Sequence, residues 1–127
     1  VGTAYLSMGR SVDALRVFER VLTIDGESIH AWLGVSRARL ACHDADGAVA
    51  AARQAIALRH DEPWARYLLA LGLEALGKIE EAVQALEICI RLRPTIPAAQ
   101  TSLRNMRRRL GRERSAIVPR PVIRTRT

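Results

Sequence analysis

The feature that most limits the fold of this chain is an internal repeat with a period of about 34 residues. When the sequence is shifted by one period, apolar residues fall on apolar residues along most of its length. Each period holds two apolar patterns of helical spacing around a short turn segment, which predicts a helical hairpin. Such a hairpin cannot bury its apolar surface alone, so it needs neighbours of its own kind. The aligned sets include Ala14, Ala48 and Ala82; Leu15, Val49 and Val83; Val21, Ala55 and Cys89; Ile24, Leu58 and Leu92; Val35, Leu69 and Leu103; and Met8, Cys42, Leu76 and Leu110.

Two further columns of the repeat predict its geometry. A column of small residues allows two helix backbones to approach closely, and it consists of Gly2, Ser36 and Ala70. A second column falls where the chain must turn sharply, and glycine there adopts a positive φ without steric cost. Its members are Gly9, His43, Gly77 and Gly111. We therefore expect a turn at Gly9-Arg10, followed by a helix that Ser11 caps and that runs to about Ile24.

The period and its hairpin unit resemble the tetratricopeptide repeat over residues 1 to about 110. The residues that carry the resemblance are Gly2 with Tyr5, Ala14 with Phe18, Trp32, Ala48, Gly77 with Ala82, and Pro94. The resemblance implies an all-α fold, a right-handed α-α superhelix of antiparallel helix pairs. We expect seven helices, in units at about 1–28, 29–62 and 63–96 with a capping helix at 97–110, and an extended basic tail at 111–127. The family implies a non-catalytic scaffold that binds a protein or peptide.

In this family the first helix of each unit lines a concave groove, and helical geometry nominates the residues. We expect Trp64, Tyr67 and Leu71 to anchor a peptide, because aromatic residues and arginine dominate binding hot spots. The alternative is that Trp64 and Leu68 only pack against the adjacent helix. A lysine and asparagine set that binds chaperone tails in part of the family is absent at the matching positions. The full candidate groove is His30, Leu33, Arg37, Trp64, Tyr67, Leu68, Leu71, Glu74, Asn105 and Arg108.

Positive charge gathers at the end of the chain. Nine arginines and one acidic residue follow position 103, whereas residues 1–103 are close to neutral. Pro119 and Pro121 oppose helix, so we expect the tail to lie extended in a groove of this molecule or of a second copy. The alternative is a contact without function. Nucleic-acid binding by the arginines is a weaker hypothesis, because the segment has no aromatic residue for base stacking. The expected tail anchors are Ile117, Val118, Val122 and Ile123.

The sequence contains no nucleophile–base pair, phosphate loop or metal cluster, so we expect no catalytic residue, cofactor or metal. Cys42 and Cys89 fall in apolar columns and are expected to be buried free thiols. Without an apolar run of membrane-spanning length or a signal peptide, we expect a cytoplasmic protein. Because Val1 falls inside a repeat and is not methionine, we expect the chain to be cut from a longer protein. It could then be the accessory region of an enzyme whose catalytic domain lies upstream.

Overall fold

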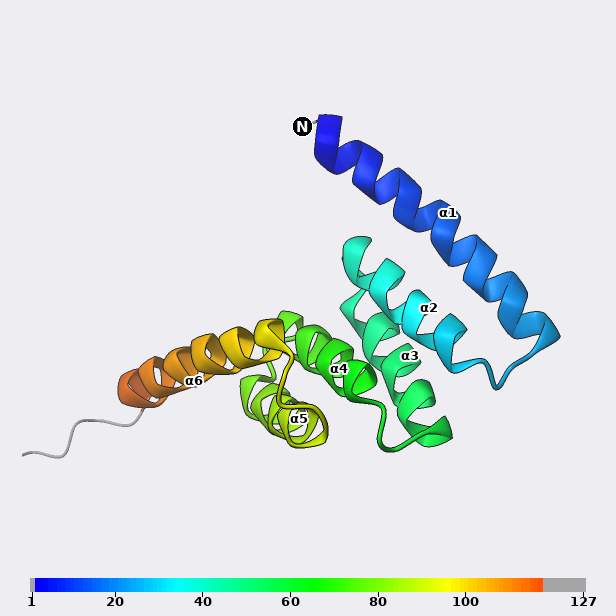
Figure 1. Ribbon diagram of the computed structural model, residues 1–127. Coiled ribbons are helices and arrows are strands. Elements are labelled where there is room, and N and C mark those ends of the chain that lie inside the picture. Colours follow the sequence, from blue (N-terminus) through cyan, green and yellow to red (C-terminus); the bar gives the residue numbers. More distant parts are fainter. Residues whose placement is uncertain (1, 118–127) are drawn as a thin grey trace, which may run out of the picture.

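The computed structural model describes the backbone of residues 2–117 and the side chains of residues 9–112. Within residues 2–117 the chain forms six α-helices and no strand, which confirms the all-α prediction. Each helix packs mainly against its neighbours in sequence, and α2 also touches α4. Figure 1 shows a curved row in which α2, α4 and α6 lie on the inner side and α3 and α5 on the outer side. The helices are α1 (Gly2–Ile24), α2 (Ile29–Ala41), α3 (Ala45–Leu58), α4 (Pro63–Ala75), α5 (Ile79–Leu92) and α6 (Pro97–Ile117).

Two of the expected turns form at the predicted residues. His43 has φ 62° between α2 and α3, and Gly77 has φ 82° between α4 and α5. The two turns have the same hydrogen-bond pattern. Asp44 N donates to Arg39 O at 2.8 Å, and at the equivalent position Lys78 N donates to Leu73 O at 2.8 Å. This bond from the residue after the left-handed position to the last helical turn closes the helix C-terminus. The hairpin is therefore repeated in its backbone as well as in its sequence.

The turn expected at Gly9-Arg10 is wrong, as is the expectation of seven helices. Helix α1 runs unbroken from Gly2 to Ile24, so Ser11 lies inside a helix and caps none. A turn at Gly9 would interrupt the backbone hydrogen bonds that join the segment before it to the rest of α1. Continuing the helix through Gly9 keeps the backbone hydrogen bonds of that segment at a propensity cost of about 1 kcal/mol.

The expected end of the capping helix is also wrong. Helix α6 continues through Gly111 to Ile117, so residues 111–117 of the expected tail are helical rather than extended. The residues after Gly111 include Arg112, Glu113 and Ala116, which are good helix formers and outweigh one glycine. The tail anchors Val118, Val122 and Ile123 lie outside the described residues, and only the backbone of Ile117 is described. The division into a repeat domain and a tail stays a prediction.

Small side chains hold the helices close together. Alanines recur at intervals of one period in the first turn of the inner helices, and Ala31, Ala65 and Ala99 are all buried. In the small-residue column, the Ser36 hydroxyl donates to Ala48 O at 2.8 Å and ties α2 to α3. Because small side chains let the helices approach closely, the rows of side chains on α2, α4 and α6 keep a fixed register along the inner side.

Helix α1 is covered on one side only. Val17 is 58% exposed, whereas Ala51, which lies one period later on α3, is fully buried. Val21 is 37% exposed, whereas Ala55 at the same place in α3 is fully buried. In α3 and α5 these positions face the inner helix of the same unit, and α1 has no such helix among residues 2–117. One end of the row therefore presents an apolar side, while α6 ends the other with arginines.

Candidate peptide-binding groove

A pocket lies on the inner side where α1, α2 and the start of α4 meet. Its volume is about 280 Å³, and its lining includes Phe18, Leu33 and Trp64 as apolar walls. His30, Leu33 and Arg37 follow one another at helical spacing along α2, so all three reach the same pocket. His30 and Arg37 are exposed and form no ion pair with any described residue. The pocket thus joins an apolar floor to the His30 imidazole and the Arg37 guanidinium, which are free to meet a ligand.

The floor of this pocket depends on a glycine. A Cβ atom at Gly34 would lie 2.5 Å from the Phe18 ring, well inside any real contact. The absence of a side chain lets the ring lie against the backbone of α2. Phe18 was not among the residues predicted for the groove, because the pattern placed it on an outer helix. Its aromatic side chain opposite a glycine of the next helix is the signal that could have found it.

The aromatic pair predicted as anchors is present at the start of α4. The rings of Trp64 and Tyr67 meet edge to face with centroids 5.7 Å apart. Trp64, Tyr67 and Leu71 are each half-buried and pack against the core with part of their surface still open. The backbone N–H of Trp64 donates to the Glu62 carboxylate at 3.0 Å, which fixes the first turn of the helix. The pair is therefore held in place without being covered.

The prediction of Leu68 as a groove residue is wrong. Leu68 is only 3% exposed and belongs to the core, as the packing alternative required. Glu74 is also engaged, because Arg109 Nη1 on α6 lies 2.8 Å from its Oε2. Arg108, which was predicted to line the groove, is exposed and forms no ion pair with a described residue. Asn105 is likewise exposed on α6.

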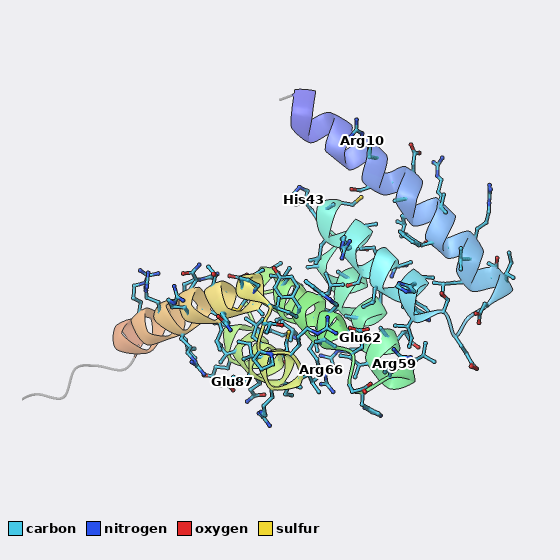
Figure 2. The ribbon with its side chains drawn as sticks, viewed as in Figure 1. Arg10, His43, Arg59, Glu62, Arg66 and Glu87 are labelled. Atoms are coloured by element: carbon cyan, nitrogen blue, oxygen red, sulfur yellow. The ribbon has the colours of Figure 1, made fainter. Side chains whose placement is uncertain are left out.

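A second pocket extends the first along α1. It has a volume of about 400 Å³ and shares Phe18, Gly34 and Arg37 with the pocket beside Trp64. Arg10, labelled on α1 in Figure 2, lies at its lining together with Ala14. This part of the groove was not predicted, because a turn was expected at Gly9-Arg10. The continuous α1 instead carries Arg10 onto the wall of the groove.

The described side chains contain no group of three or more histidine, cysteine, aspartate or glutamate residues that could hold a metal ion. Both cysteines are free thiols, with Cys89 buried and Cys42 half-buried. Burial raises the pKa of the Cys89 thiol, and nearby Arg93 opposes this in part. Among the described helices, none combines the length and apolarity needed to cross a bilayer.

Comparison with known proteins agrees with the repeat geometry. Residues 64–95, which hold α4 and α5, match the family model of the tetratricopeptide repeat. Residues 64–95 therefore form a tetratricopeptide repeat. The match covers the unit whose turn is closed by Gly77, and the other units follow it at the same period.

Known proteins resemble this chain in sequence or in structure at low sequence identity. Superkiller protein 3 of Saccharomyces cerevisiae is 29% identical over 87 residues, which is 68% of this chain and 6% of that protein. The first repeat domain of Spaghetti (RPAP3), solved with the HSP90 peptide SRMEEVD, has a TM-score of 0.78 at 22% identity and 87% coverage of both chains. A mutant O-GlcNAc transferase of Thermobaculum terrenum has a TM-score of 0.74 at 26% identity, covering 80% of this chain and 19% of that one. This chain therefore spans a small part of its curated relative.

Proposed function

We propose that this chain is a non-catalytic binding module that holds a segment of a partner protein in its inner groove. The observation that carries the proposal is the pocket formed by Phe18, Leu33 and Trp64 with Arg37 at its edge. An apolar side chain would fill the pocket, and an acidic residue beside it would meet the Arg37 guanidinium. The Spaghetti domain, which has the same fold, was solved with a peptide bound.

The partner segment is expected to be apolar, helical or extended, with an acidic residue placed near Arg37. Tyr67 and Leu71 would continue the contact along α4, because both keep open surface beside Trp64. The arginines and the half-buried aromatic residues supply the directional contacts. The apolar floor supplies most of the buried area. A cytoplasmic location is part of this proposal.

Selection of peptides from a displayed random library, followed by fluorescence anisotropy, tests the groove. Peptides selected by the unaltered chain should bind at least about tenfold more weakly to the variant Tyr67→Ala/Leu71→Ala, because each truncation removes about 1 kcal/mol or more at a hot spot. The matched control is Leu58→Ala/Leu92→Ala, which removes two part-exposed apolar residues from α3 and α5. An equal loss of peptide affinity in both variants would show that the inner groove is not the binding surface.

A second candidate is an accessory role within a larger enzyme. The O-GlcNAc transferase with the similar fold is such a case, because this chain corresponds to 19% of it. Activity of the full-length protein, measured with and without residues 1–117, tests this role. A full-length protein without any catalytic domain would exclude the accessory role in an enzyme.

Self-association through the tail and binding of nucleic acid are the remaining candidates. Removal of residues 112–127 should lower the mass measured by light scattering if the tail joins two copies, and an unchanged mass would exclude that. Binding of DNA or RNA by the arginine-rich end should weaken steeply with added salt. Lack of binding at low salt would exclude a nucleic-acid ligand.

A further inference from the structure

Three equivalent junctions lie along the outer side of the row, where an inner helix meets the outer helices beside it. Each is defined by three positions that recur once in every period. The first junction has Glu19, Trp32 and Arg39, and the last has Glu87, Gln100 and Arg107. The middle junction has Arg53, Arg66 and Leu73. Because the backbone repeats with the sequence, the three sets can be compared position by position.

The first and last junctions satisfy their polar groups internally. In the first, Arg39 Nη2 lies 3.6 Å from Glu19 Oε2. In the last, Arg107 Nη2 lies 2.7 Å from Glu87 Oε2. The same ion pair thus recurs two periods later, with the acid on the outer helix and the arginine on the next inner helix.

The remaining residue of each of these two junctions also has a hydrogen-bond acceptor. Trp32 Nε1 donates to Gly26 O at 2.9 Å. The Gln100 amide donates in the same way to Pro94 O. In both cases the acceptor is a backbone carbonyl of the loop before the inner helix, at the same place in the period. The first and last junctions are therefore closed.

The middle junction lacks every one of these partners. Arg53 stands where the other junctions have glutamate, and the buried Leu73 stands where they have arginine, so the ion pair cannot form. Arg66 takes the place of the tryptophan and the glutamine, and its Nε is buried without a hydrogen-bond partner. Figure 2 labels Arg66 on α4. Two arginines are thus left without an acceptor among the described residues.

A pocket of about 280 Å³ lies at this junction, and both arginines line it. Its apolar part comes from Leu69, Leu73 and Ile88. The acids closest in sequence and space do not neutralise the arginines. Glu62, one helical turn before Arg66, accepts from Trp64 N instead. Glu81 is exposed at the pocket and forms no ion pair with a described residue.

We propose that the middle junction binds the carboxylate of an acidic side chain, glutamate or aspartate, from a partner protein. The carboxylate would replace the acid that Glu19 and Glu87 supply at the other junctions, and its short apolar stem would lie on Leu69 and Ile88. Arginine holds carboxylates through paired N–H donors, and such charged hydrogen bonds are among the stronger ones in proteins. The site lies on the outer side of the row, so it is separate from the inner groove.

The carboxylate is favoured over phosphate by the composition of the pocket. One wall is apolar, and the carboxylate of Glu81 is part of the lining. A doubly charged phosphate would be repelled by Glu81 and would place polar oxygens against Leu69 and Leu73. A single carboxylate carries less charge, so Glu81 repels it less strongly than a phosphate, and its methylene stem can lie against the apolar wall.

The test is a titration of the ¹⁵N-labelled chain, followed through the Nε–Hε resonance of Arg66. The probes are the blocked tripeptide acetyl-Leu-Glu-Ala-amide, the same peptide with glutamine in place of glutamate, and inorganic phosphate. We expect a saturable shift with the glutamate peptide only. Absence of a shift with that peptide, or an equal shift with either of the other two probes, would overturn the proposal.

Two exposed substitutions sharpen the result. Arg53→Glu restores an acid at the junction, where it can pair with Arg66 and fill the site. Affinity for the glutamate peptide should fall at least about tenfold, since a hydrogen bond to a charged group contributes about 1.5–3 kcal/mol. Arg91→Glu changes the net charge equally on an exposed arginine of α5 that does not line the pocket, and it should leave the affinity unchanged. Equal loss in both variants would reduce the effect to overall charge and contradict the site.

Discussion

The contact between α3 and α4 predicts that the substitution Gly72→Ala changes stability in opposite directions, depending on the residue at position 49. Gly72 on α4 faces Val49 on α3, and a Cβ atom at Gly72 would lie 2.6 Å from Val49 Cγ2. Alanine gains about 1 kcal/mol over glycine inside a helix. Overpacking of a dense core costs about 1–3 kcal/mol, and the β-branched valine cannot rotate away easily. Gly72→Ala should therefore destabilise the chain by about 1 kcal/mol.

The same substitution should stabilise a chain that already carries Val49→Ala. Removing the two methyl groups of Val49 costs about 2 kcal/mol through lost burial and the cavity left behind. In that background the alanine methyl at position 72 enters free space, so the helix gain of about 1 kcal/mol remains. The expected coupling between the two sites is about 2 kcal/mol, well above the usual error of additivity.

Urea unfolding of the four chains, followed by far-ultraviolet circular dichroism, measures the cycle. The matched control is Gly9→Ala, because a Cβ atom at Gly9 meets nothing within 4 Å. This control should stabilise α1 in both backgrounds. If Gly72→Ala has the same sign with Val49 and with alanine at position 49, the close approach of α3 and α4 does not control stability as argued.

Three further predictions concern the turns and the thiols. His43→Gly should raise the free energy of unfolding by about 1 kcal/mol and Gly77→Ala should lower it by a similar amount, because both positions have positive φ. Urea unfolding measures both changes, and two changes of the same sign would contradict this reasoning. A thiol reagent should modify half-buried Cys42 rapidly and Cys89 only on unfolding, so equal rates would refute the burial of Cys89. Because burial raises the pKa of Cys89, the folded state holds its proton more tightly, and stability should fall as pH rises above the ordinary thiol value of about 8.5. Cys89→Ala should reduce this alkaline loss in thermal unfolding, and an unchanged loss would assign it to other groups.

The repeat pattern predicted the fold well where each element has a partner in its own period. The turns at His43 and Gly77 lie where the columns placed them. These features depend on residues within a few positions in sequence, or one period away. Local chemistry and periodicity together are then sufficient.

The prediction failed at both ends of the row, where the period has no partner on one side. Gly9 and Gly111 belong to the turn column, yet both lie within helices, because glycine permits a turn without requiring one. What decides is whether the chain beyond the glycine gains more by packing back than by continuing the helix. That balance depends on tertiary contacts, which a column of aligned residues does not contain.

Only part of the site could be predicted, because the rest also depends on tertiary contacts between helices. Arg37, Trp64 and Tyr67 could be placed on the inner side from the family resemblance together with helical spacing. The partner of Glu74 could not, because Arg108 and Arg109 differ by one position and the rotation of α6 decides which one reaches it. Phe18 entered the groove only because α1 and α2 approach closely at Gly34.

The one-sided cover of α1 also gives the molecule an order of unfolding. In an array whose units touch mainly their neighbours, the free energy of opening a unit depends on the surface it shares with them. Among the described helices, α1 packs mainly against α2, whereas α4 is held by α2, α3 and α5. Amide hydrogens of α1 should therefore exchange with solvent through detachment of that helix, long before those of α4. Loss of structure would spread inward from the amino-terminal helix rather than begin at the middle.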